Sequence, residues 1–164
     1  MALRSALASF ALLAGFAAAP SAPAQVPEVE LKAAFVYNFV LFTEWPAATL
    51  PAGRPLTICA DASGAQLGAL RQLEGRTVGG HALSISADPA GRCHVVLYEH
   101  AADAGTGAAG TLTVCDGPSS TCRDAVITLL RDGDRVRFDV DASRARARGL
   151  SLSSKLLRLA REVR

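Results

Sequence analysis

The stretch LTICADASGAQLGALRQL, residues 56–73, places a short β-rich run directly before a helical one. The run at 56–60 is apolar and partly β-branched, which is typical of a strand buried on both faces of a parallel sheet. In the segment 65–73, the leucines at 67, 70 and 73 share one side of a helix. A buried strand followed by such a helix is the repeating unit of an α/β fold.

The same alternation continues downstream, where β-rich runs are separated by helical or glycine-rich segments. This order of elements favours a sheet that is covered by helices. The predicted strands are HALSISA at 81–87, HVVLY at 94–98 and TLTVC at 111–115, with a short helix and a loop expected at 100–110.

Residues 125–141, AVITLLRDGDRVRFDVD, are two β-rich runs joined through Asp132-Gly133. Asp-Gly between such runs is a strong signal for an antiparallel hairpin. The predicted fold class is therefore α/β: a single domain with a central mixed β-sheet flanked by helices, stabilised by disulfides.

An apolar helix is predicted ahead of the first strand. After Pro27, the stretch LKAAFVYNFVLFTEWP at 31–46 predicts a helix that ends near Glu44, because the residue before a proline is pushed out of helical geometry. The apolar run stops well short of the roughly 20 residues that a bilayer span requires, so the helix should be covered by protein. The predicted core face is Leu31, Phe35, Phe39 and Phe42, and the interrupting polar residues are Lys32, Asn38 and Glu44.

The C-terminal stretch GLSLSSKLLRLAREV, residues 149–163, predicts a second terminal helix. Ser151 can cap this helix, because a serine side chain accepts hydrogen bonds from the first unpaired backbone N–H groups. The side chains predicted to point inward are Leu152, Leu156, Leu159 and Val163.

Residues 1–24 have the pattern of a cleaved Sec-type secretory signal peptide. Arg4 is followed by an apolar run at 6–19 and then by Ala22-Pro23-Ala24, so cleavage is expected after Ala24. Residues 25–164 would then form the mature domain. Cleavage removes one arginine and no acid, which lowers the formal net charge from +2 to +1. A nearly neutral domain does not indicate nucleic-acid binding.

Four cysteines in a secreted domain of this size indicate two disulfides, and the sequence alone allows three connectivities. The alternative is a metal site that includes His94 and His100. A metal site is the weaker interpretation, because the chain has no CxxC pair. The cysteines are Cys59, Cys93, Cys115 and Cys122.

The sequence gives no indication of an enzyme or of a cofactor. Gly105, Gly107 and Gly110 form a literal GxGxxG, but the third glycine leads into a predicted strand instead of the helix that should receive a pyrophosphate. The common nucleophile, metalloprotease and phosphate-binding motifs are absent from the sequence. The histidines, none of which has the spacing of a catalytic triad, are His81, His94 and His100.

One local cluster of charges lies near the C-terminus. Asp139 and Asp141 are followed by Arg144, Arg146 and Arg148. The simple interpretation is a solvated helix or turn. The functional interpretation is a patch that attracts an acidic partner or an anionic membrane surface, with an effect that salt would weaken.

Three features together point to a known family: the opening LKAAFVYNFVLFTEWP, a central pair of cysteines seven residues apart, and the closing GLSLSSKLLRLA. They resemble the YfiR family of periplasmic proteins. Members of that family begin with a helix of the type K-A-A-F-x-Y-N-F that ends in W-P, and they finish with a G-L-x-[LI]-S-S-x-L-L-x-L-A helix. The resemblance covers nearly the whole mature chain.

The resemblance implies a disulfide-bonded α/β domain, commonly a homodimer, with Cys59 paired to Cys93 and Cys115 paired to Cys122. It also implies a partner, the periplasmic sensor domain of an inner-membrane diguanylate cyclase, which the family represses. Envelope or redox stress would then raise cyclic di-GMP and promote biofilm formation. We expect Cys115–Cys122 to be the redox-sensitive pair, because a tight disulfide loop tends to be more reducible.

Two positions depart from the family pattern. Members often carry Gly-Gly before the penultimate hairpin, where this chain has Arg123-Asp124. They often carry an asparagine near the end of the last strand, where this chain has Asp141. Both departures concern the same edge of the domain.

Several polar and aromatic side chains are candidates for contacts with a partner. Asn38 is expected to be buried and hydrogen-bonded to a backbone group. Trp45 is either a core residue or an exposed anchor, because aromatic residues dominate the energetics of interfaces. The predicted partner-binding residues are Tyr37, Asn38, Glu44, Trp45, Arg144, Arg146 and Arg148.

The leading hypothesis is a non-enzymatic periplasmic regulator that represses a cyclase. The alternative is a periplasmic sensor that binds a small ligand in the loops at the strand ends of the sheet. A thiol oxidoreductase has less support, because the chain lacks CxxC.

Overall fold

The computed structural model describes residues 26–62, 64–88, 91–99 and 108–164. It confirms the predicted single α/β domain with a mixed sheet. The predicted signal peptide at 1–24 and its cleavage site lie outside the described residues, as do His100 and most of the predicted helix and GxGxxG loop at 100–110.

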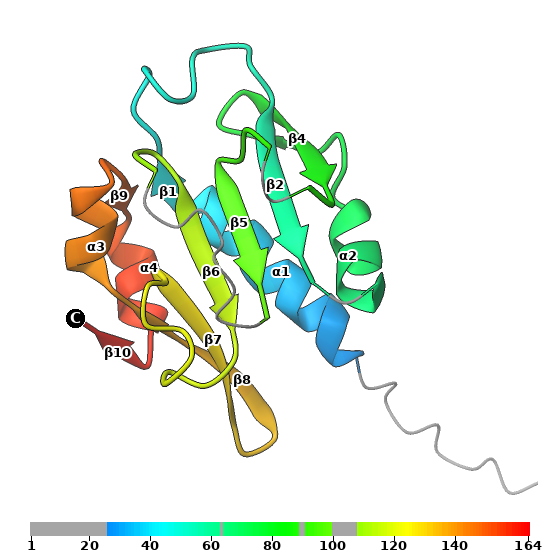
Figure 1. Ribbon diagram of the computed structural model, residues 1–164, viewed down its shortest axis with the longest axis vertical. Coiled ribbons are helices and arrows are strands. Elements are labelled where there is room, and N and C mark those ends of the chain that lie inside the picture. Colours follow the sequence, from blue (N-terminus) through cyan, green and yellow to red (C-terminus); the bar gives the residue numbers. More distant parts are fainter. Residues whose placement is uncertain (1–25, 63, 89–90, 100–107) are drawn as a thin grey trace, which may run out of the picture.

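A mixed sheet of eight strands forms the centre of the described residues (Figure 1). The central strands are parallel, the β7–β8 and β3–β4 pairs are antiparallel, and β10 joins β8 in parallel. The strands predicted at 56–60, 81–87, 94–98 and 111–115 are present to within one residue at each end. Across the sheet the order is β10 (Glu162–Val163), β8 (Arg135–Val140), β7 (Ile127–Asp132), β6 (Leu112–Asp116), β5 (Val95–Tyr98), β2 (Leu56–Asp61), β4 (His81–Ser86) and β3 (Thr77–Val78).

The predicted hairpin is confirmed as β7–β8. Asp132 is the last paired residue of β7, opposite Arg135, so the two-residue loop is Gly133-Asp134. Gly133 has a φ of +60°, which side chains with a Cβ rarely adopt. A glycine at the first loop position fits the twist of the flanking strands, and this explains the strength of the sequence signal.

Helix α1 (Glu28–Leu41) crosses one face of the sheet and packs beside α2 (Gly64–Arg71) (Figure 1). Its centre is Phe39, which is fully buried and lies 5.0 Å from the ring of Phe138 on β8. Phe35 completes the aromatic cluster. None of the helices in the described residues is long and apolar enough to cross a bilayer.

The core face of α1 differs from the predicted one. Leu31 is 39% exposed, and Phe35 and Phe42 are only partly buried. Because the helix has apolar side chains almost all round, its periodicity did not determine which side faces the sheet. The buried residues of α1 are Ala33, Val36, Phe39 and Val40.

Helix α1 also ends earlier than Glu44. Residues Thr43–Glu44 form strand β1, which pairs antiparallel with β9 (Ser151–Leu152). The helical conformation stops at Leu41 because the next residues take backbone partners from a distant segment. The Thr43 hydroxyl donates a hydrogen bond to the Phe39 carbonyl at 2.7 Å and so covers an open end of the helix.

The predicted C-terminal helix is wrong in both its cap and its length. Ser151 lies in β9, and Ser153 instead accepts hydrogen bonds from the backbone at the start of α4 (Ser154–Leu159). After α4, residues Glu162–Val163 become β10 because they pair with the free edge of β8. Of the four leucine and valine side chains predicted to point inward, Leu156 is buried, Leu152 is partly buried, and Leu159 and Val163 are exposed.

A bidentate ion pair holds the C-terminal segment on the sheet. Asp139 on β8 has a buried carboxylate, and both of its oxygens accept hydrogen bonds from the guanidinium of Arg161, at 2.8 and 2.5 Å. The backbone N–H of Arg161 also bonds the Phe138 carbonyl. Arginine matches a carboxylate with two parallel hydrogen bonds, so this contact fixes the position of the chain as well as its charge.

The second face of the sheet carries both disulfides. Cys59 pairs in register with Val96, and Cys115 with Tyr98, which places them on the face opposite the core under α1. Tyr98, Val96 and the Cys115–Cys122 pair form a separate buried cluster there. A central parallel strand must be buried on both faces. Here cross-linked loops provide part of the second cover.

Replacing Phe39 with alanine should destabilise the domain by about 3–5 kcal/mol, because it empties a fully buried aromatic site. Urea denaturation of the oxidised protein measures this loss. The control is Leu159→Ala on α4, whose side chain is 65% exposed and which should change stability by less than about 0.5 kcal/mol. A small effect of Phe39→Ala would contradict the described packing of α1 on the sheet.

Candidate functional site

The segment after α1 forms one wall of a groove, which we call the Trp45 groove. Its volume is about 370 Å³, and it lies between the end of α1, the β1 segment and the β3–β4 turn. The floor is mainly aliphatic, and Glu44 and His81 add polar groups. The lining residues are Val40, Leu41, Thr43, Glu44, Trp45, Leu50, Leu56, Val78, Gly79 and His81.

Trp45 is the distinctive side chain of this groove. It is partly buried and packs against the main core, and its role as a contact for a partner stays a prediction. Its indole Nε1 is buried and has no hydrogen-bond acceptor among the described residues. Most buried N–H groups in proteins are paired, and leaving one unpaired costs about 1–3 kcal/mol. Trp45 therefore combines contact with the groove and a buried N–H that has no acceptor among the described residues.

The rim of the groove presents apolar and acidic side chains to solvent. Leu41 is 42% exposed at the last position of α1, and Glu44 is exposed on β1. From Ala33 to Phe42 the chain has no charged residue. The sequence did not mark Leu41 as a surface residue, because the uninterrupted apolar run hides which leucine faces outward.

Two other predicted contact residues lie further back along α1. Tyr37 is partly buried, and the guanidinium of Arg76 lies 5.4 Å from the centre of its ring. This distance is typical of a cation–π contact. Asn38 is exposed, and its amide donates to the carbonyl of Ala34 in the same helix at 2.9 Å. The expectation that Asn38 is buried is therefore wrong, because the sheet-facing side of α1 is occupied by Val36 and Val40.

The three arginines of the charge cluster do not form one surface. They lie on or just after α3 (Ala142–Ala147), where Arg146 is exposed and Arg144 is partly buried. Arg148 is only 7% exposed. Its guanidinium donates to the Thr111 carbonyl (3.3 Å), the Thr113 hydroxyl (2.7 Å) and the Asp124 carbonyl (3.1 Å). Arg148 thus packs on the second face of the sheet.

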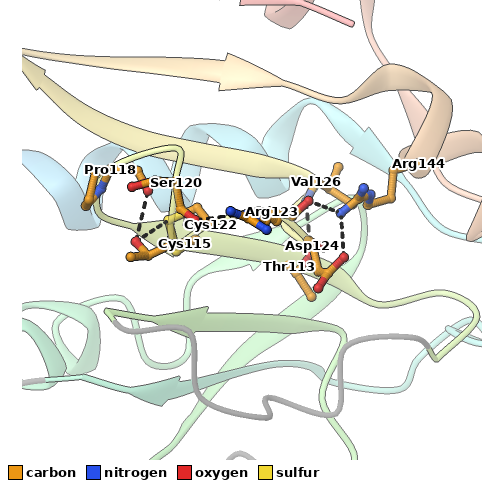
Figure 2. Close-up of a disulfide and its surroundings, with 10 residues drawn as sticks. Thr113, Cys115, Pro118, Ser120, Cys122, Arg123, Asp124, Val126 and Arg144 are labelled. Carbon is orange, nitrogen blue, oxygen red and sulfur yellow. Dashed lines mark hydrogen bonds and ion pairs between the residues drawn. A yellow bond between two sulfur atoms is a disulfide. The ribbon is translucent and has the colours of Figure 1, made fainter.

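Arg144 joins α3 to the disulfide loop. Its Nη1 donates to the Arg123 carbonyl at 2.5 Å and lies 3.4 Å from the Asp124 carboxylate. Figure 2 shows this guanidinium reaching the segment that directly follows Cys122. Arg144 and Arg148 therefore both hold residues 123–124, where the family pattern often has Gly-Gly.

Asp141 accounts for the second departure from the family pattern. It is the N-cap of α3, and its carboxylate accepts hydrogen bonds from the Arg144 N–H at 2.8 Å and the Ser143 hydroxyl at 2.7 Å. Burial alone would raise the pKa of Asp141, but these two hydrogen bonds and the positive charge of Arg144 lower it overall. Asparagine caps helices about as well as aspartate, so the substitution preserves the cap.

All four cysteines are joined in disulfides, Cys59–Cys93 and Cys115–Cys122, in the pairing that the family resemblance implies. The sulfurs are therefore not available as thiolate ligands. Within the described ranges, no group of three His, Cys, Asp or Glu side chains is arranged to hold a metal ion. The two bonds differ in access: Cys115 and Cys122 are both buried, whereas Cys93 is partly exposed.

This difference in burial predicts the order of reduction. Thiol–disulfide exchange requires access to a sulfur atom. We expect a limiting amount of a thiol reductant to open Cys59–Cys93 before Cys115–Cys122, which is the opposite of the order expected from loop length. Alkylation of the folded protein followed by peptide mass spectrometry measures the order. Earlier labelling of Cys115 and Cys122 would show that loop length outweighs burial, and unfolding in denaturant should abolish any difference that burial causes.

The two neighbouring arginines should behave differently on mutation. Arg148→Ala removes three hydrogen bonds from a charged donor and leaves buried acceptors unpaired, so the free energy of unfolding should fall by about 2 kcal/mol or more. Arg146→Ala changes an exposed side chain on α3, two positions earlier, and should alter stability by less than about 0.5 kcal/mol. Urea denaturation measures both. Equal effects would contradict the assigned burial.

Comparison with known proteins identifies one family. The profile of the YfiR/HmsC-like family matches residues 29–161. The match runs from the second residue of α1 to Arg161, which forms the ion pair with Asp139. No protein with a curated functional description matches the sequence.

Proposed function

The chain belongs to the YfiR/HmsC-like family, and from this premise we propose that it represses a membrane-bound diguanylate cyclase by binding its periplasmic domain. The family is regulatory and periplasmic, and it is not a catalytic family. The match over residues 29–161 is the observation that carries the proposal. Export by the signal peptide at 1–24, with cleavage after Ala24, belongs to the same proposal, as does a homodimeric state.

The proposed mechanism is a shift in the equilibrium of the partner. The repressor binds the inactive conformation of the cyclase's periplasmic domain more tightly than the active one. The cyclase then moves toward the inactive state by the difference between the two binding free energies. No chemistry at the interface is needed, which fits a family that regulates and does not catalyse.

The Trp45 groove is the proposed contact with the cyclase. It combines an exposed leucine, an acidic rim residue and a tryptophan with an unpaired buried N–H. Interfaces concentrate their binding energy in aromatic anchors that become fully buried on association.

The other predicted contact residues take smaller or indirect roles. Arg146 is exposed and can attract an acidic surface during association. Arg144 and Arg148 act through the structure, because they hold the segment after Cys122. Tyr37 and Asn38 lie on α1 outside the lining of the groove and are proposed as secondary contacts. Opening of the accessible Cys59–Cys93 bond is the proposed link to redox stress, since it frees the second face of the sheet from one cross-link.

A single substitution at the groove rim tests the proposed function. Leu41→Glu adds a charge at an exposed position, so the domain should stay folded while the contact with the cyclase is lost. Cellular cyclic di-GMP should rise to the level of a strain that lacks the protein. Pull-down with the cyclase's periplasmic domain should show at least a tenfold weaker affinity, roughly what one or two kcal/mol of lost contact produces.

The matched control is Leu159→Glu, which adds the same charge at an exposed leucine on α4 and should leave repression intact. Circular dichroism and thermal melting confirm that both variants fold. If Leu41→Glu represses as well as the wild type, the groove is not the contact. If deletion of the protein leaves cyclic di-GMP unchanged while the cyclase is expressed, the proposed function itself is wrong.

A further inference from the structure

A basic cavity lies at the amino ends of the parallel strands. Its volume is about 490 Å³, within the usual range for small-ligand pockets. A second cavity of about 320 Å³ shares four of its lining residues, including Arg92 and His94. The residues that line the larger cavity are Ala48, Thr49, Pro51, Arg54, Pro55, Thr57, Arg92 and His94.

The two arginines of this cavity have no carboxylate partner in the part of the chain that the structure describes. Arg54 and Arg92 are both exposed, and neither guanidinium has a hydrogen bond or an ion pair with any residue that the structure describes. Among the described residues that line the two cavities there is no aspartate or glutamate. By contrast, the arginines Arg144 and Arg161 elsewhere in the domain have carboxylate partners. Two unpaired arginines in one cavity are suited to an oxyanion, which a guanidinium can bind through two parallel hydrogen bonds.

His94 is a structural residue of the cavity wall and does not supply charge. Its Nδ1 accepts a hydrogen bond from the Thr57 N–H at 3.0 Å, and its Nε2 donates to the Thr49 carbonyl at 3.2 Å. This arrangement requires the neutral ring, and burial lowers the pKa of His94 in agreement with it. The positive charge of the cavity therefore comes from the arginines and does not change over the physiological pH range.

Both arginines are carried by backbone that is held in place. The carbonyl of Arg54 accepts a hydrogen bond from Nδ1 of His81 at 2.7 Å, and its N–H donates to Pro51 in a turn that contains Gly53 at positive φ. Arg92 precedes Cys93, which is bonded to Cys59 on β2. A binding group on fixed backbone loses less conformational entropy when a ligand arrives.

We infer that this cavity binds a small organic anion through Arg54 and Arg92, with a phosphate or carboxylate group between the guanidinium groups. The side chains of Ala48, Pro51 and Pro55 provide an apolar wall for the body of the ligand. This inference does not depend on repression of a cyclase, because it rests on the cavity and its charges alone.

Direct binding to the mature, oxidised protein tests the inference. Isothermal titration calorimetry with glucose 6-phosphate and with succinate should show saturable binding to the wild type, while uncharged glucose should not bind. The double variant Arg54→Gln, Arg92→Gln should lose at least about tenfold in affinity, since it removes charge-assisted hydrogen bonds. Arg158→Gln, an exposed arginine on α4, is the matched control and should bind like the wild type.

The two probes also identify the anion. Binding of only one probe that the double variant loses supports the inference and assigns the cavity to phosphate or to carboxylate. The affinity should fall as salt rises, because the attraction is between charges near the surface. Absence of saturable binding by both probes overturns the inference. Equal binding by the wild type and the double variant, with circular dichroism showing that both are folded, overturns it as well.

Discussion

The fold depends on burying the central strands β2, β5 and β6 on both faces. A parallel strand has no solvent-facing side, so each face needs its own cover. On one face α1 provides this cover, with Phe39 against Phe138 at its centre. On the other face the structure uses Tyr98, the two disulfides and the stem and head group of Arg148. The four cysteines and Arg148 thus serve mainly to keep solvent away from that second face.

This second cover links parts of the molecule that bear on regulation. The segment after Cys122 is joined to β6 by the disulfide and to α3 by Arg144 and Arg148. The accessible bond, Cys59–Cys93, joins β2 to the segment just before β5, and Cys93 lines the smaller cavity that adjoins the basic cavity. A change in the redox state, or in what occupies the cavity, would act first on this side of the sheet. The Trp45 groove is built from other elements, at the end of α1 and the β3–β4 turn.

The sequence predicted the regular interior of the fold well. Buried strands such as 56–61 can be predicted because they consist of β-branched and apolar residues. The hairpin can be predicted because a tight turn needs its glycine. It failed where a partner distant in the chain decides the conformation. The sequence predicted Thr43–Glu44 as the last turn of a helix and Glu162–Val163 as part of another helix. In the structure each segment is instead a strand, paired with β9 and with β8 respectively. Local periodicity contains no information about such pairing.

The candidate sites also divide into residues that the local sequence could identify and residues that only the fold brings together. Glu44 and Trp45 were predicted as contacts and do line one groove, whereas Arg148 was grouped with exposed arginines although it is buried. Arg54 and Arg92 were not singled out at all, because they are 38 positions apart in the chain and only the fold brings them to one cavity. Spacing along a helix can group residues. It cannot show which of them will be buried in the folded domain.

The pairing of β1 with β9 has a consequence for how the Trp45 groove forms. Residues 43–44 take their backbone partners from residues 151–152, so the wall of the groove is completed by a segment more than 100 positions further along the chain. Contacts between such distant segments form late, because a long loop must first be closed. A chain cut short before residue 151 would contain every lining residue of the groove and still lack the finished groove. Formation of the groove is thus tied to folding of the rest of the domain.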